Sequence, residues 1–475
     1  MTTTVKNIEA LTADVFLDIL RDHWYGQDVR SGPDGKDSPG LRINAISATK
    51  VDQGVLSDVY RVRLEYSMPN QDTNNNVDGQ EQQGAEPISS APVPAPPTDW
   101  LVKFCRPDLG LSWMCRNETI FYGRLAPTLM QNHHRLPFAI PKFLNGSDQH
   151  IILEEVTNIE TYPLTEGCPP EKIDFLLKSL AAWHAACWDS ELLPPRSLPD
   201  AKGRSIERHT AATEIHGKQT LLVFPPGMGQ RLHPLQKEGL FVASWRKFMD
   251  HLRPKLSLLR SDQQESPLDE GPFEFASDLC RRLSDRKLRD VHDLVHRHRV
   301  TCVHGDFHIA NWLFPRTTAA TTPNAKPVLV DFATVGYGNP LIDLVFFLVV
   351  STNDDVASDP QLLLKEYYRL LIEYDPKIST KMTLSTLQEW FPWALLCQFM
   401  ILVAYDGVCR DIAEAEEDEQ KRRSQIQHFG NVNRRVILAI RSVDCWDRIL
   451  STLDCTTLEE RLEAERFCQN TALTI

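Results

Sequence analysis

One segment in the second half of this 475-residue chain limits the possible folds most strongly. The stretch of residues 302–314 begins with one apolar run, CV at 302–303, and continues as a polar loop; a 13-residue polar connection then leads to a second apolar run, VLV at 328–330. Short apolar runs bounded by polar turns are typical of buried strands, so we predict strand–loop–strand. Asn339 as N-cap and Pro340 in the first position then predict a helix that carries the apolar run 341–350.

The polar loop, residues 302–314, carries a regularly spaced set of side chains. His304, Asp306 and Asn311 follow one another with one and four residues between them, and Asp331 ends the second apolar run. This order is used for phosphoryl transfer, in which a carboxylate meets the attacking hydroxyl and Mg²⁺ neutralises the phosphate oxygens. We therefore expect Asp306 to accept the substrate proton or to aim its hydroxyl. Asn311 and Asp331 offer the oxygen ligands that Mg²⁺ prefers.

Three nearby residues are candidates for supporting this loop. We expect His304 to brace the loop by hydrogen bonds, without transferring a proton. His308 is a candidate contact for the substrate or for a phosphate group. Asp343 heads a strongly apolar helix, where a carboxylate needs hydrogen-bond partners, and the backbone N–H groups of the loop are suitable ones.

Histidines and a carboxylate this close together also fit a metal site. His304 and Asp306, with a distant histidine, would form the 2-His-1-carboxylate iron site of an oxygenase. This alternative accounts for neither Asn311 nor the second apolar run. Three more histidines lie in the charged stretch 291–300, and two of them, His292 and His296, are spaced four apart as metal ligands on a helix are. No third metal ligand lies nearby in the sequence, and the neighbouring arginines would repel a cation. We interpret these three as surface or helix-end residues.

Phosphoryl transfer also requires a lysine on a strand and an acidic partner on a helix upstream. Lys103 lies between apolar residues in WLVKFC, a setting that implies a charged partner. Glu118 lies in a helix predicted over 112–127 and ended by Pro127, and is a suitable partner. The two residues predict a lysine–glutamate ion pair at a nucleotide site.

Two weaker elements complete the nucleotide-binding pattern. The stretch DQGVLSDVYRV places Gly54 and Ser57 in a turn between two predicted strands, where backbone N–H groups and a hydroxyl are able to reach a phosphate. The stretch ILEEV, residues 152–156, is a short apolar strand. Its backbone, at Glu154 and Val156, is the candidate to meet the adenine.

Strand patterns dominate the early part of the chain and helical periodicity the later part, which predicts an α+β protein of two unequal lobes. The predicted lobes are 1–155, opening with an amphipathic helix over 8–24, and 156–475, with the catalytic loop and a metal-binding segment at 328–333. Residues 69–98 have almost no apolar bulk and end in a proline run. We expect them to be a disordered insert between two paired strands.

Composition narrows the class of protein further. A net charge of −13 disfavours general nucleic-acid binding. The most apolar stretches, 341–350 and 392–405, are shorter than the roughly 18–20 residues needed to cross a bilayer, so we expect core helices and no membrane span. The N-terminal sequence lacks the plan of a signal peptide, and eleven cysteines without a CxxC pair indicate reduced thiols. We expect a cytoplasmic protein, of unspecified oligomeric state.

The blocks WLVKFC, NETIFYGRL, ILEEV, LAAWHAACW, CVHGDFHIANWLF and LVDFATVGYGNPLIDLVFFL occur in this order, with the phosphate turn, over residues 54–348. In these blocks the chain resembles the small-molecule kinases of the protein-kinase-like superfamily. The resemblance is to the aminoglycoside phosphotransferase and choline kinase group and, within it, to the ecdysteroid kinase-like (CHK kinase-like) family. It implies a bilobal protein-kinase-like fold with a small β-rich first lobe and a large helical second lobe.

The resemblance also implies an activity. The enzyme would transfer a phosphoryl group from ATP, with Mg²⁺, to a hydroxyl group of a small molecule of the sterol, amino alcohol or amino sugar type. Lys103 would hold the α- and β-phosphates and pair with Glu118. Asp306 would be the catalytic base, and Asn311 and Asp331 would hold Mg²⁺.

Departures from the protein-kinase pattern matter for the substrate. Gly305 replaces the arginine of H-R-D, Ala333 replaces the glycine of D-F-G, and no A-P-E segment follows. We therefore expect neither an activation loop switched by phosphorylation nor a protein substrate. A catalytically inactive pseudokinase, acting as a nucleotide- or ligand-binding module, is the alternative from a different class.

Overall fold

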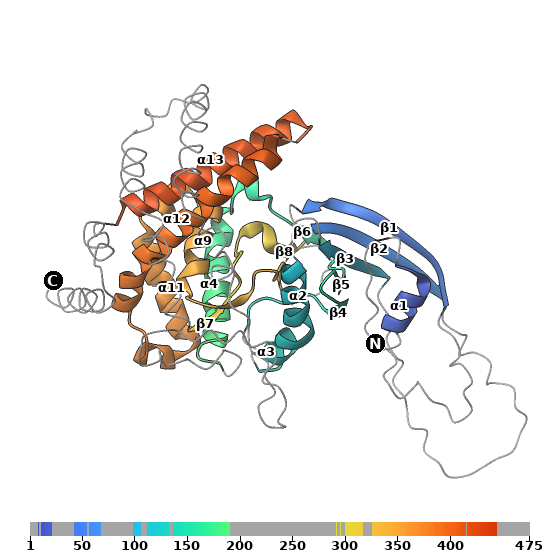
Figure 1. Cartoon of the computed structure of the whole chain (residues 1–475). Helices are drawn as coiled ribbons and strands as arrows, with labels where there is room; N and C mark the ends of the chain where they lie inside the picture. Colours follow the sequence, from blue (N-terminus) through green and yellow to red (C-terminus); the bar gives the residue numbers. More distant parts are fainter. Residues whose placement is uncertain are drawn as a thin grey trace, which may run out of the picture. The chain divides into compact units, whose positions relative to one another are not determined.

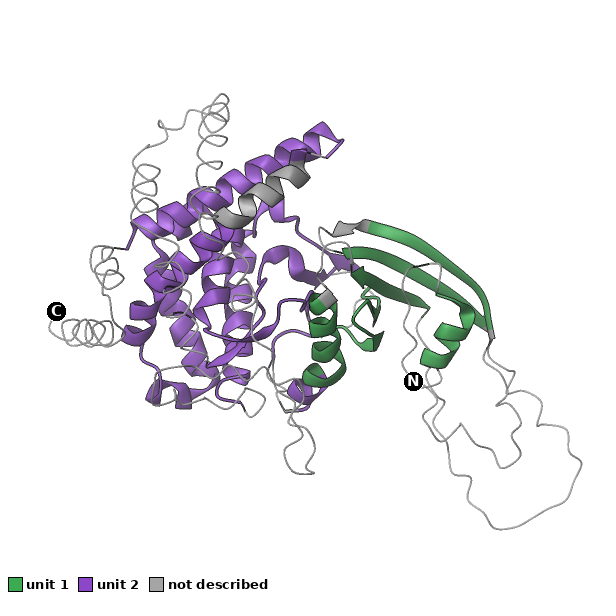
Figure 2. Ribbon diagram, viewed as in Figure 1, with its two compact units in different colours: residues 1–126, 140–157 green, residues 127–139, 158–475 purple. Residues whose placement is uncertain are grey.

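The computed structural model of the chain has two compact units (Figure 2). The first comprises residues 1–126 with 140–157, and the second comprises 127–139 with 158–475. Residues 127–139, which the sequence pattern assigned to the first lobe, group with the second unit. The structure describes residues 8, 11–20, 42–54, 57–67, 98–105, 112–132, 136–190, 291, 295, 300–316, 325–414 and 416–443.

Two predictions fall outside these described residues. The insert predicted over 69–98 lies outside them apart from Thr98, and so do the three histidines of the stretch 291–300.

The first unit is built on a five-stranded antiparallel sheet with the order β1-β2-β3-β5-β4 (Figure 1). The strands β2 and β3 pair directly, with Val59 opposite Lys103, as predicted for the strands that flank the insert. The strands are β1 (Arg42–Gly54), β2 (Ser57–Ser67), β3 (Asp99–Cys105), β4 (Phe143–Gly146) and β5 (His150–Glu154).

The two faces of this sheet serve different purposes. Trp100, Val102 and Phe104 of β3 are buried in an apolar core with the helix α1 (Ala13–Leu20), where the ring of Phe16 meets Trp100 edge-on at 5.1 Å. The alternate residues of β3 lie on the other face. There Lys103 and Cys105 contact the helix α2 (Ser112–Ile120). The apolar alternation of β3 therefore leaves one sheet face for polar chemistry.

The helix predicted over 112–127 runs further than expected. After α2 it widens into a π-helical turn, Phe121–Leu125, in which the N–H of Ala126 donates to the carbonyl of Phe121, and it continues as α3 (Ala126–Asn132). The prediction that Pro127 ends the helix is wrong. The wide turn restarts the hydrogen-bond ladder, so the proline stands in the first turn of α3, where a missing N–H is tolerated.

The second unit is mainly helical, with short strands that fix its loops. The strand β7 (Thr301–Val303) pairs with β10 (Gly336–Gly338), and β8 (Trp312–Pro315) lies between β6 (Ile159–Glu160) and β9 (Val328–Leu329). Besides α3, the helices in the described part of this unit are α4 (Pro170–Ala186), α9 (Leu341–Ser351), α10 (Asp354–Ser358), α11 (Pro360–Tyr374), α12 (Leu384–Glu414) and α13 (Glu419–Arg441), with 3₁₀ turns at Leu164–Glu166, Ile309–Asn311 and Pro376–Thr380.

The predicted strand–loop–strand pattern and the α+β class are both confirmed. The apolar runs 341–350 and 392–405 lie in α9 and α12, and Leu344 and Phe347 of α9 are fully buried. Within the described part of the chain, no helix combines the length and the apolar run needed to cross a bilayer.

The cysteines are not all reduced thiols. Cys105, at the end of β3, forms a disulfide with Cys115 of α2, and their Cα atoms are 6.0 Å apart. The prediction of unpaired thiols is therefore wrong for this pair, because their sequence spacing gave no sign that strand and helix meet. Cys168, Cys187, Cys302 and Cys397 are free thiols.

Candidate active site

The predicted catalytic loop lies between β7 and β8 in the second unit. Its apolar residues point into the core: Phe307, Ile309 and Trp312 are fully buried. They alternate with the polar residues, so the packing that anchors the loop also aims the side chain of Asp306 toward the surface, where it is 34% exposed.

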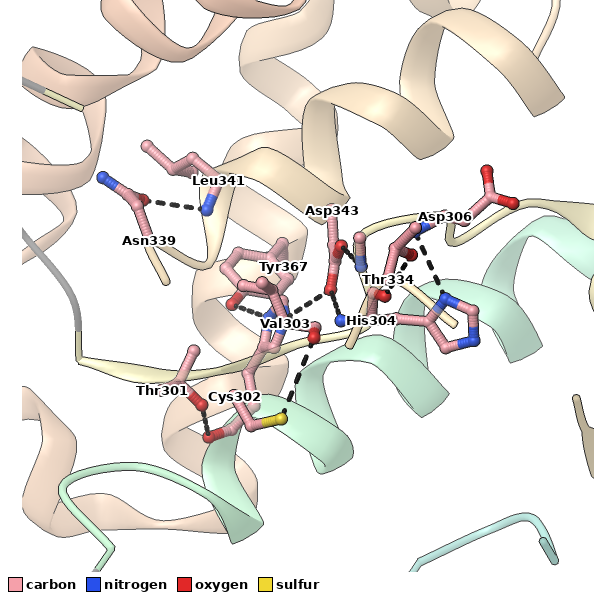
Figure 3. Close-up of polar contacts among 12 residues, drawn as sticks. Thr301, Cys302, Val303, His304, Asp306, Thr334, Asn339, Leu341, Asp343 and Tyr367 are labelled. Atoms are coloured by element: carbon pink, nitrogen blue, oxygen red, sulfur yellow. Dashed lines mark hydrogen bonds and ion pairs between the residues drawn. The ribbon is translucent and has the colours of Figure 1, made fainter. Parts of the chain in front are cut away.

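Asp343, in the first turn of α9, holds the backbone of this loop (Figure 3). Its Oδ2 accepts a hydrogen bond from the N–H of His304 and its Oδ1 accepts one from the N–H of Gly305, both at 2.7 Å. The carboxylate is fully buried, so these donors compensate the lost hydration. The structure thus brings Asp343 to the backbone groups that the sequence pattern suggested.

The sequence pattern missed two further supports of Asp343. His184 of α4 places Nε2 3.1 Å from Asp343 Oδ2, and its Nδ1 is 2.7 Å from the hydroxyl of Tyr367 on α11. Burial and the charge of Asp343 raise the pKa of Tyr367 well above its ordinary value. A histidine within the otherwise apolar block LAAWHAACW was the available signal, since a buried imidazole needs polar partners.

Gly305 has a steric reason to be glycine. Its φ is +84°, in the left-handed region, and a Cβ placed there would lie 2.7 Å from the carbonyl oxygen of Thr334. Thr334 in turn donates its hydroxyl hydrogen to the carbonyl of His304, at 2.9 Å. The loop therefore passes too close to residue 334 for the arginine of the protein-kinase pattern.

His304 braces the loop through both ring nitrogens. Its Nδ1 accepts from the N–H of Asp306 at 3.3 Å, and its Nε2 donates to the carbonyl of Val330 at 3.1 Å. Burial is the main effect on its pKa, which is lowered, so the ring is neutral. Because neither nitrogen is left for a metal ion, the iron-oxygenase alternative loses its first histidine ligand.

Asp306, His308 and Asn311 form one polar cluster. The Nδ2 of Asn311 donates to the carbonyl oxygen of Asp306 at 2.8 Å and lies 3.5 Å from its carboxylate. The Nε2 of His308 lies 3.4 Å from Asp306 Oδ1 and 3.4 Å from Asn311 Nδ2. Burial opposes a charge on His308, but Asp306 and Asp331 outweigh it and raise its pKa.

Asp331 follows β9 in an unusual backbone conformation. Its φ is +63°, a region that costs a non-glycine residue free energy and that is concentrated at functional sites. The N–H of Val330 donates to the carbonyl of Asn311 at 3.0 Å, so Asn311 and Asp331 lie at the same end of the β8–β9 ladder. The charges of Asp306 and Asp331 both act on His304 and His308.

The predicted lysine–glutamate pair is present in the first unit. Lys103 Nζ lies 2.8 Å from Glu118 Oε2, and the two side chains are 16% and 2% exposed. Gly54 and Ser57 face each other at the end of the β1–β2 hairpin, and Ser57 is buried.

The predicted adenine strand is β5. Glu154 is its last residue and pairs with Trp100 of β3, and Val156 follows two residues later. Both residues are half-buried.

The chain matches one protein-family model. Residues 110–379, more than half of the 475 residues, match the model of the ecdysteroid kinase-like family. No curated protein matches the sequence.

The solved structures to which the chain is similar have low sequence identity to it. The chain is similar to the ethanolamine kinase of Plasmodium vivax, at 11% identity over 94% of this chain and 92% of that chain, with a TM-score of 0.37. The chain is also similar to a choline/ethanolamine kinase family protein of Mesorhizobium loti, at 11% identity over 92% of this chain and 99% of that chain, with a TM-score of 0.39. Its similarity to the choline kinase of Cryptosporidium parvum is 10% identity over 88% of this chain and 94% of that chain, with a TM-score of 0.34.

The fold class and the family match define the class of protein as a small-molecule kinase. The chain belongs to the ecdysteroid kinase-like family. This assignment rests on the family model, and the distant structures add no weight to it.

Proposed function

We propose that this kinase transfers the γ-phosphoryl group of ATP to a hydroxyl group of a small molecule and requires Mg²⁺. One observation carries the proposal. A partly exposed carboxylate, Asp306, is held next to Asn311 on a loop whose backbone is fixed by the buried carboxylate of Asp343. Such positioning is the main contribution that a protein makes to phosphoryl transfer.

Asp306 is the group that meets the acceptor hydroxyl. Its carboxylate accepts the hydroxyl hydrogen bond and so aims the oxygen lone pair at the γ-phosphorus. As the new oxygen–phosphorus bond forms, the bond from phosphorus to the ADP oxygen breaks and the hydroxyl proton passes to Asp306. His308, 3.4 Å from Asp306 Oδ1, restrains the carboxylate orientation.

Asn311 and Asp331 fit a divalent cation. An amide binds a cation through its oxygen, and the bonds of Asn311 Nδ2 to Asp306 set which way that amide is turned. Amide and carboxylate oxygens are the donors that Mg²⁺ prefers. When bound, Mg²⁺ neutralises the charge on the phosphate oxygens. The strained backbone of Asp331 supports a functional position for its carboxylate.

Lys103 is the proposed phosphate-binding residue of the first unit. Its ion pair with the buried Glu118 restrains an otherwise flexible side chain. We also assign Gly54 and Ser57 to the phosphates, and the backbone at Glu154 and Val156 to the adenine.

Asp306→Asn tests the proposal. The purified protein is incubated with Mg²⁺, γ-labelled ATP and a metabolite extract, and the compound that gains phosphate is identified. The variant should lose transfer by at least about a hundredfold while its affinity for Mg-ATP stays near that of the wild type. Full transfer in the variant would remove Asp306 from the reaction.

A nucleotide-binding pseudokinase is the competing function. Mg-ATP would raise its melting temperature, as it would for an active kinase, yet no compound of the extract would gain phosphate. The acceptors we propose for the active kinase are of the sterol, amino alcohol or amino sugar type.

A further inference from the structure

The disulfide of the first unit lies beside the proposed phosphate-binding lysine. Cys105 follows Lys103 by two residues on β3, and two residues apart on a strand share a face. Cys115 precedes Glu118 by three residues on α2, and three residues apart on a helix share a face. The disulfide and the Lys103–Glu118 ion pair are therefore two parallel links between one strand face and one helix face.

The disulfide also adjoins the proposed phosphate turn. Ser57 of β2 stands directly opposite Cys105 of β3 in the antiparallel register. Opposed residues of an antiparallel pair have side chains on the same face. Ser57, Lys103 and Cys105 thus lie on one face of the sheet.

The position of Glu118 relative to Lys103 depends on how α2 lies against β3. The helix continues through the π-helical turn into α3, so its own hydrogen bonds keep it helical but do not set its distance from the strand. The Lys103–Glu118 ion pair orders the lysine side chain, but it acts only while the backbones of α2 and β3 stay at the distance that lets the two side chains meet. A covalent bond one helical turn from Glu118 fixes the spacing between α2 and β3.

We propose that the Cys105–Cys115 disulfide is a positioning element for Lys103, and that breaking it weakens the binding of ATP phosphates. This inference rests on the proposed phosphoryl transfer from ATP. Neither sulfur touches the substrate. The disulfide acts through the distance between β3 and α2, which sets whether Glu118 holds the lysine ammonium in place.

The redox state is measured first. In protein purified without reductant, Cys105 and Cys115 should resist alkylation. Treatment with dithiothreitol should expose both, as the dithiol gives two electrons and two protons to the disulfide and becomes a cyclic disulfide itself. Alkylation of both cysteines in the untreated protein would overturn the proposal.

Kinetics then separate positioning from general stability. In the variant Cys105→Ser/Cys115→Ser, the KM for ATP should rise about tenfold, equivalent to about 1.4 kcal/mol, with the kcat at saturating ATP and the KM for the acceptor unchanged. Cys168→Ser is the matched control, because this free thiol donates to the carbonyl of Pro169 and serine is able to do the same. Its KM for ATP should equal that of the wild type.

A second readout does not depend on turnover. The rate at which an amine-reactive ester labels Lys103 is followed by peptide mass spectrometry, with the half-exposed Lys142 as internal reference. Labelling of Lys103 should be faster in the double variant and in reduced wild type, with Lys142 unchanged. Equal Lys103 rates in oxidised and disulfide-free protein, with only a lower melting temperature, would show that the bond stabilises without positioning.

These readouts distinguish the two proposals. Wild-type protein that transfers no phosphate would contradict the proposed function, while the labelling rates would still decide the role of the disulfide. If the double variant does not fold, wild type before and after reduction gives the same comparison.

Discussion

Replacing Asp343 by asparagine isolates the contribution of the buried carboxylate. Both carboxylate oxygens accept a backbone N–H at 2.7 Å, from His304 and Gly305, and one also faces His184. Asparagine keeps one acceptor and turns an NH₂ donor toward the other N–H. A lost charge-assisted hydrogen bond is worth about 1.5–3 kcal/mol, and the unsatisfied buried donor costs about 1–3 kcal/mol more.

We therefore expect Asp343→Asn to lower the free energy of unfolding by about 3 kcal/mol and to reduce kcat by about a hundredfold, as the loop loses its position. The free energy of unfolding is measured by urea unfolding monitored by circular dichroism, and kcat is measured by the phosphate-transfer assay. Asp354→Asn is the control, since this half-exposed carboxylate pairs only with Arg434 among the ion pairs of the described residues, and its change should stay within about 1 kcal/mol. Equal stability and equal kcat in the two variants would refute the reasoning.

Three further predictions test other parts of the second unit. Gly305→Ala should lower stability by about 1–2 kcal/mol from its positive φ alone, and further because the new Cβ meets Thr334; an unchanged melting temperature would contradict this. Asp331→Asn should weaken the binding of Mg-ATP but not of ATP without metal, measured by calorimetry; equal Mg-ATP affinity would remove Asp331 from the metal site. Burial, then Arg435, lower the pKa of His428 from 6.5 to about 4, so the unfolded chain binds a proton that the folded chain does not. Stability should fall as the pH drops from about 6.5 to about 4, by about 3 kcal/mol in total, and His428→Gln should flatten this slope in urea unfolding; an unaltered slope would exclude His428.

Local patterns predicted much of the candidate site. His304, Asp306 and Asn311 lie within one short loop, so their sequence spacing restricts how far apart the side chains are able to lie. The apolar alternation around Lys103 placed it on a strand, because side chains of a strand alternate between faces. Glu118 follows on the next helix, and the ion pair between these two residues is present in the structure.

Such local patterns did not predict contacts between residues that are distant in the sequence. His184 and Tyr367 are 183 residues apart in sequence, and they support the catalytic loop through Asp343 from two different helices. The disulfide of Cys105 and Cys115 depends on how α2 packs against β3.

The sequence by itself determined the class of fold, the blocks that resemble the kinase family and the polar residues available for phosphoryl transfer. Each of these depends on residue spacing and periodicity within short stretches of the chain. The tertiary structure alone decided which groups support them. It gave Asp343 its backbone donors and buried imidazole, used both ring nitrogens of His304 and linked Cys105 to Cys115. The physical reason is that a buried polar group is stabilised by whichever partner the packing brings near it, and separation along the chain does not specify that partner.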